Sequence, residues 1–129
     1  MTDRQRRGQW IWFDPIYRVN VALLNCPAEQ AKSRLARVLP EDTAREFDDA
    51  LSDLVCDGRF VVAKHPTTGL IVVIWTKPDA DAAVVAHEAF HATCEVMRQK
   101  GLSLKRSSEE AYAYWLEWLM REISSRRSR

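Results

Sequence analysis

Apolar residues recur at helical spacing in the stretches 27–39, 41–55 and 108–123, and this pattern predicts three amphipathic helices. A fourth stretch, 79–100, is apolar on most of its faces, which predicts a helix buried through the centre of the domain. Aspartates that can cap a helix stand at the start of this fourth stretch, and Gly101 follows its end as a stop signal. The chain is therefore expected to be rich in helices.

Two further runs have the composition of β-strands. Residues 59–64 and 70–77 flank a short connection that contains turn formers, which predicts an antiparallel pair. The second run lacks polar alternation, so both of its faces are expected to be covered, one of them by the helix 79–100. Residues 16–24 predict another strand, preceded by the apolar cluster 10–13. Strands and helices in this order predict an α+β domain with a small antiparallel sheet.

Composition narrows the class of protein. A chain of 129 residues with 47% hydrophobic residues has the size and the apolar content of a single domain with a real core. The basic ends, 1–9 and 124–129, are expected to be flexible tails. The formal charge of +1 argues against a nucleic-acid partner, and neither a leader-like start nor an apolar run of spanning length indicates a membrane. We expect a cytoplasmic protein without disulfides or a thiolate metal site, because the cysteines show no Cys-x-x-Cys spacing: Cys26, Cys56 and Cys94.

The segment 87–91 reads His-Glu-Ala-Phe-His, a pattern typical of a zinc site on a helix. Residues four apart lie on one face of an α-helix, about one turn from each other, so His87 and His91 can converge on one tetrahedral metal ion. Glu88 would then stand beside the metal, where a carboxylate can act as a general base toward a water molecule. The competing interpretation is a pair of packed core histidines with Glu88 paired to an arginine.

A catalytic zinc site of this type needs a third protein ligand. No other His or Cys lies at a suitable position on the next element, but Glu109 and Glu110 open the following predicted helix, and eighteen residues separate His91 from Glu110. A helix start that packs antiparallel to the histidine helix can deliver one carboxylate to the metal. Neighbours on a helix differ by about 100° in direction, so either glutamate can serve. Glu110 also fits a capping box with Ser107.

The spacing His-Glu-x-x-His-x18-Glu resembles that of the gluzincins, zinc metallopeptidases that hold the metal with two helical histidines and a glutamate from a second helix. In their aminopeptidase branch the third ligand lies in a run of the type Asn-Glu-Gly-Phe-Ala, and here the segment 109–113, Glu-Glu-Ala-Tyr-Ala, matches with its second residue in the ligand place. The resemblance covers residues 79–123, and the short chain is also similar to small metallopeptidase-like proteins encoded by bacteriophages. It implies the following site: the ligands His87, His91 and Glu110, with Glu109 as the fallback, and the general base Glu88.

The gluzincin resemblance implies a minimal zincin-like domain, in which the small sheet packs on an active-site helix and a following ligand helix, with additional N-terminal helices. It implies a zinc-dependent metallopeptidase that hydrolyses peptide or protein substrates and whose cleft is bordered by an edge strand. A chain of 129 residues leaves no room for a second domain to select the substrate, so specificity is expected to come from a protein partner, from an oligomer or from the short segments before residue 79. The alternative is a non-catalytic zincin-fold binding or assembly protein with a structural or vestigial metal site, for which the likeness to phage proteins suggests a phage origin.

Overall fold

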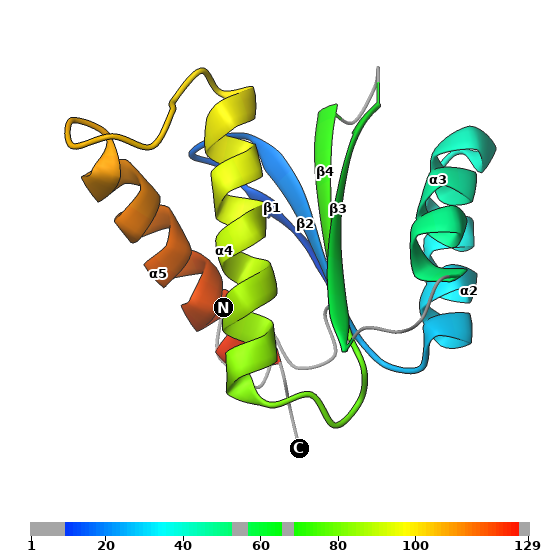
Figure 1. Ribbon diagram of the computed structural model, residues 1–129. Coiled ribbons are helices and arrows are strands. Elements are labelled where there is room, and N and C mark those ends of the chain that lie inside the picture. Colours follow the sequence, from blue (N-terminus) through cyan, green and yellow to red (C-terminus); the bar gives the residue numbers. More distant parts are fainter. Residues whose placement is uncertain (1–9, 53–56, 66–68, 127–129) are drawn as a thin grey trace.

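A four-stranded sheet lies between two layers of helices in the computed structural model, which describes residues 10–52, 57–65 and 69–126 (Figure 1). The strands are β1 (Ile11–Asp14), β2 (Val19–Asn25), β3 (Gly58–His65) and β4 (Gly69–Thr76). The helices of the described part are α2 (Ala28–Val38), α3 (Glu41–Ser52), α4 (Ala82–Gln99) and α5 (Glu109–Arg126). The predicted α+β class is confirmed, and none of the described helices is long and apolar enough to cross a membrane.

The sheet is mixed, with the strand order β1-β2-β4-β3. The predicted antiparallel pair of β3 and β4 is confirmed, and β1 also pairs antiparallel with β2. The expectation of an antiparallel sheet is wrong for the central pair, because β2 and β4 run parallel in a register that matches Val19 with Leu70 and Asn25 with Thr76. The helical hairpin of α2 and α3 returns the chain to the end of the sheet where β2 finished. The β3–β4 hairpin therefore starts there, and its second strand inserts beside β2 in the parallel direction.

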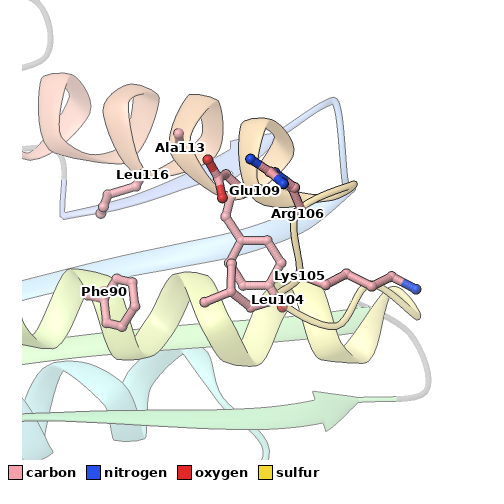
Figure 2. Close-up of a pocket in the computed structure, with 8 residues that line it drawn as sticks. Phe90, Leu104, Lys105, Arg106, Glu109, Ala113 and Leu116 are labelled. Carbon is pink, nitrogen blue, oxygen red and sulfur yellow. The ribbon is translucent and has the colours of Figure 1, made fainter.

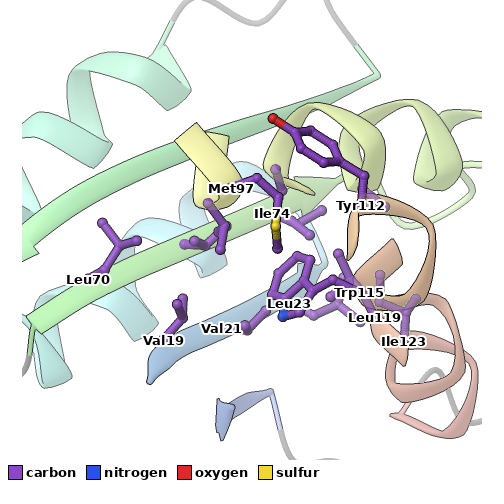
Figure 3. Close-up of a cluster of buried hydrophobic side chains, with 14 of the residues drawn as sticks. Val19, Val21, Leu23, Leu70, Ile74, Met97, Tyr112, Trp115, Leu119 and Ile123 are labelled. Atoms are coloured by element: carbon purple, nitrogen blue, oxygen red, sulfur yellow. The ribbon is translucent and has the colours of Figure 1, made fainter. Parts of the chain in front are cut away.

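Strand β4 is buried along almost its whole length, as its unbroken apolar run predicted. Leu70, Val72 and Ile74 enter the core beneath α4 and α5 (Figure 3), and Ile71, Val73 and Trp75 enter the core beneath α2 and α3. Successive side chains of a strand point to opposite faces of the sheet, so a strand with helices on both sides needs apolar residues at every position.

Helix α4 begins and ends as the sequence predicted. The carboxylate of Asp81 accepts a hydrogen bond from the backbone N–H of Val84 at 3.0 Å. At the other end Gly101 adopts a φ of 81°, and the backbone N–H of Leu102 donates to the carbonyl of Met97 at 2.8 Å. This is a Schellman ending, which requires a left-handed residue and favours glycine.

The prediction that α4 is buried through the centre of the domain is wrong. One side of the helix packs on the sheet, but its outer side stays accessible, and the Phe90 side chain is 45% exposed. The sheet and α5 cover only part of the surface of α4 (Figure 1), so Phe90 stays accessible.

Helix α5 is attached to the edge of the sheet that lies farthest from β3. The indole N–H of Trp115 donates to the buried carboxylate of Asp14 at 2.9 Å, and the Arg126 guanidinium lies 4.1 Å above the Trp12 ring. The expected flexible tail from residue 124 is therefore wrong for residues 124–126, which complete α5 and include a buried arginine. The rest of that tail, the N-terminal tail 1–9 and Cys56 lie outside the described residues.

Candidate metal centre

His87 and His91 lie one helical turn apart on the exposed side of α4, with their Nε2 atoms 3.1 Å from each other. Their rings meet edge to face, with centroids 4.7 Å apart. Two imidazoles bound to one tetrahedral zinc at the usual Zn–N distance of about 2.0–2.1 Å have their nitrogens about 3.3–3.4 Å apart. The pair therefore has nearly the separation that two vertices of a zinc site require. Both rings are exposed, so the interpretation as packed core histidines is wrong.

The His91 ring is held from the side of the sheet. It stacks on the ring of Phe60, with centroids 5.3 Å apart and an angle of 10° between the planes. Phe60 belongs to β3, an edge strand that pairs with β4. This contact restricts rotation of the imidazole and orients the histidine pair toward the β3 side of α4.

Glu88 is the buried member of the motif. Its residue surface is only 7% exposed, and its Oε2 atom lies below the surface without a hydrogen-bond partner among the described residues. A buried carboxylate oxygen without a partner is costly, and such groups in folded proteins point to catalysis or to a ligand, a water or an ion. The helix therefore presents two imidazole nitrogens and one unpartnered carboxylate oxygen within five residues.

Gly58, the first residue of β3, allows the sheet to approach Glu88. A Cβ atom added at this position would lie 3.0 Å from the Cγ of Glu88, 3.1 Å from a methyl of Val84 and 3.2 Å from the carbonyl oxygen of Trp75. Contacts this short require a neighbour to move. The missing side chain lets Glu88 fit between α4 and the start of the edge strand.

The two candidates for the third ligand, Glu109 and Glu110, are exposed at the start of α5. Glu109 lines a groove on the other side of α4, together with Phe90 and Leu104 (Figure 2). Within residues 10–52, 57–65 and 69–126, no three His, Cys, Asp or Glu side chains are grouped so that they could hold a metal ion. The structure thus pairs His87 with His91 on α4, where Glu88 follows His87 in the sequence, and it groups neither glutamate of α5 with them. The assignment of Glu110 or Glu109 as a ligand stays a prediction.

The position of α5 explains this separation. Trp115 and Arg126 attach α5 to β1, at one edge of the sheet, whereas His91 faces β3 at the opposite edge. The α5 side of α4 is consequently the side that carries Phe90. The hydroxyl of Ser108 also ties the connection before α5 in place through the carbonyl of Ser103 and the backbone N–H of Lys105.

Cys94 lies one turn after His91 and is partly buried against the core. Burial raises the pKa of its thiol above the ordinary value, and the nearby Arg98 acts in the opposite direction. A raised pKa favours the neutral thiol, whereas a zinc ligand has to be the thiolate. The partial burial agrees with the prediction that Cys94 packs in the core.

Two residues of the site were missed by reasoning from the sequence. Gly58 follows Asp57 in a dipeptide typical of turns, so the sequence gives no sign that its small size is needed beside Glu88. Phe60 is one apolar residue within a strand, and no local pattern in the sequence indicates that it contacts His91. Both depend on the pairing of α4 with β3, which involves segments far apart in the sequence.

Comparison of the chain with protein-family models, with curated proteins and with solved structures finds no match. The resemblance to the gluzincins accordingly rests on the His-Glu-x-x-His motif and on the spacing to Glu110. The local geometry of His87, Glu88 and His91 is independent of that resemblance.

Proposed function

We propose that this protein is a zinc-dependent hydrolase of peptide bonds. The observation that carries the proposal is the 3.1 Å separation of the two exposed Nε2 atoms of His87 and His91, beside a buried carboxylate with an unpartnered oxygen. A helix built only for packing gains nothing from burying Glu88 in this way. The arrangement supports a metal held by the two histidines, with an acid–base group next to it.

The proposed ligands are His87, His91 and Glu110, with Glu109 as the fallback. The two imidazoles fit the nitrogen separation of a tetrahedral zinc site. The assignment of Glu110 as the third ligand is supported by the eighteen residues that separate it from His91, and not by the position of either glutamate in the structure. When bound, zinc would supply the Lewis acidity that polarises the carbonyl of the bond to be cleaved.

Glu88 is the proposed general base. It would take a proton from the attacking water, whose oxygen adds to the carbonyl carbon, and then give this proton to the amine as the C–N bond breaks. Its burial at the start of β3 keeps other water away from the carboxylate and restricts its rotamers. The edge strand β3 lies on the same side of α4 as His91, so an extended peptide beside this strand would pass the histidine pair.

The test begins with elemental analysis of metal per chain, on protein purified without a His tag. The set consists of the parent, His87→Ala, Glu88→Gln, Glu109→Ala, Glu110→Ala and the control Glu117→Ala, which removes an exposed glutamate two turns further along α5. We expect near-stoichiometric zinc in the parent, in Glu88→Gln and in Glu117→Ala. The zinc should be lost in His87→Ala and in one of the two other glutamate variants, which identifies the third ligand.

Hydrolysis is then measured with a library of internally quenched fluorescent peptides. The parent is expected to cleave members of the library, and Glu88→Gln should lose this activity while it keeps its zinc. Equal cleavage by the parent and Glu88→Gln would contradict the assignment of the base. Stoichiometric zinc without any cleavage would favour the non-catalytic binding or assembly protein. Folded protein without metal would contradict the hydrolase and leave a binding or assembly protein with a vestigial site.

A further inference from the structure

A groove of about 530 Å³ lies between α4, the connection 100–108 and the first turns of α5 (Figure 2), and neither His87 nor His91 lines it. Phe90, Leu104 and Leu116 supply its apolar surface. The side chains of Phe90 and Leu104 are unusually accessible for large apolar residues, at 45% and 54% exposed. A concave apolar surface of this volume has the size of a ligand or peptide site.

The groove is held open by hydrogen bonds within its own wall. The Tyr112 hydroxyl donates to the carbonyl of Leu102 at 2.6 Å, so the connection is fastened to α5. The backbone N–H of Lys105 donates to the Ser108 hydroxyl at 3.1 Å, and the backbone N–H of Ser108 donates to the Lys105 carbonyl at 3.0 Å. Leu104 is therefore kept at the rim of the groove by a folded turn, which reduces the ordering cost of binding.

The charge of the rim is positive. The segment 98–106 contains four cationic residues and no acidic residue, and one of the four, Arg98, is paired with Glu95 of α4 at 3.0 Å. Lys105 and Arg106 line the groove itself, against the single carboxylate of Glu109. An apolar floor with a cationic rim is complementary to a segment in which a large apolar side chain is flanked by carboxylates.

The terminal segments of this chain do not have that chemistry. Residues 1–9 contain three arginines and one aspartate, and residues 127–129 contain two arginines and no acid. Neither segment contains a large apolar side chain other than that of Met1. Like charges at the rim oppose the docking of these segments, which favours an acidic segment of a partner protein as the occupant.

We propose that this groove binds a short acidic peptide segment of a partner protein. A large apolar side chain of the segment contacts Phe90 and Leu104, and its carboxylates lie at Lys105 and Arg106. Extended or helical segments of this type dock on apolar grooves through one or two anchoring side chains. Neither the imidazoles of His87 and His91 nor a bound metal takes part in this binding. The proposed peptide site is therefore independent of the proposed hydrolase activity.

The experiment is a selection of short random peptides displayed on filamentous phage, with the parent protein as the target. We expect the enriched peptides to combine Asp or Glu with at least one Leu, Phe, Met or Trp. The affinity of the most enriched peptide is then measured by fluorescence anisotropy. It should weaken about tenfold in Phe90→Ser, in Leu104→Ser and in the charge reversal Lys105→Glu with Arg106→Glu. It should also weaken as the salt concentration rises.

The matched control is Val38→Ser, which removes another apolar side chain, 49% exposed, from helix α2 on the opposite face of the sheet. This variant and His87→Ala should bind the peptide as the parent does. The proposal is overturned if no peptide is enriched, or if the enriched peptides are basic or uncharged. It is also overturned if the groove variants bind the peptide as well as Val38→Ser does. A fatty acid also combines an apolar chain with a carboxylate, so binding of sodium laurate in the groove without binding of acidic peptides would overturn the proposal too.

Discussion

The two helical layers of this protein cover the same sheet in different ways. Under α2 and α3 the core is made of fully buried apolar side chains, among which Leu35, Phe47 and Leu51 are at most 1% exposed. Under α4 and α5 the core is equally apolar, but α4 also buries the carboxylate of Glu88 and leaves Phe90 accessible. Both features of α4 oppose stability, because a buried carboxylate oxygen without a hydrogen-bond partner and an exposed aromatic ring are each unfavourable.

Exposure alone does not separate the two layers, because Val38 of α2 is 49% exposed; the buried carboxylate of Glu88 does. Departures from good packing in otherwise consistent proteins concentrate at functional sites. On α4 they occur on two sides: toward β3, where His91 contacts Phe60, and toward α5, where Phe90 lines the groove. The following predictions use stability and metal binding to test whether the two layers differ in this way.

The largest effect is expected for Phe47→Ala in the α2–α3 layer. Phe47 is fully buried, so its truncation should lower the free energy of unfolding by about 3–5 kcal/mol. The same truncation of the half-exposed Phe90 should cost about 1 kcal/mol or less, because most of its contact surface already faces water. Urea denaturation measures both values. Similar costs for the two variants would show that the α4 layer depends on its exposed side chains as much as the other layer depends on its core.

The next effect concerns metal-linked stability. If zinc binds the folded protein alone, an excess of 100 times the dissociation constant adds about 2.7 kcal/mol to the free energy of unfolding. His87→Ala should remove this increment, whereas its stability without zinc should stay within about 0.5 kcal/mol of the parent, because His87 is exposed. Thermal unfolding with and without zinc gives both quantities. An increment that persists in His87→Ala would place the metal elsewhere.

Gly58→Ala tests the close approach between β3 and Glu88. The new Cβ would crowd Glu88, Val84 and the carbonyl of Trp75, so we expect a loss of about 1–3 kcal/mol. In a Glu88→Ala background, where the Cγ atom of residue 88 is absent, part of this loss should be relieved, since residues in contact couple by about 0.5–3 kcal/mol. A double-mutant cycle measures the coupling. Strictly additive losses would show that Gly58 does not act through Glu88.

The smallest effect is expected at the groove wall. Tyr112→Phe removes the hydrogen bond to the Leu102 carbonyl and should cost about 1 kcal/mol in the free energy of unfolding. Tyr114→Phe, at a side chain that is 66% exposed, is the matched control and should have no measurable effect. Chemical denaturation compares the two variants. Equal stabilities would indicate that the connection is held by its backbone and by Ser108 without the tyrosine.

Much of the fold followed from local patterns in the sequence. The four helices, the β3–β4 hairpin and the coverage of β4 on both faces were predictable because each depends on periodicity and turn chemistry within a short segment. The parallel pairing of β2 with β4 was not predictable, because it depends on where the helical hairpin returns the chain. The strand β1 and the end of α5 were missed for a related reason: Asp14 and Arg126 acquire their partners from distant segments, Trp115 and Trp12.

The sequence alone determined that His87, Glu88 and His91 share one helix, with the two imidazoles on the same face, because the four-residue spacing matches one helical turn wherever the helix packs. Only the tertiary structure decided which neighbours those residues meet. The attachment of α5 to β1 turns Phe90 toward α5 and His91 toward β3, so Glu109 lies in the groove and Phe60 lies on the histidine. The rotation of a helix about its axis is set by the sum of its packing contacts, and those contacts come from segments that local patterns do not connect.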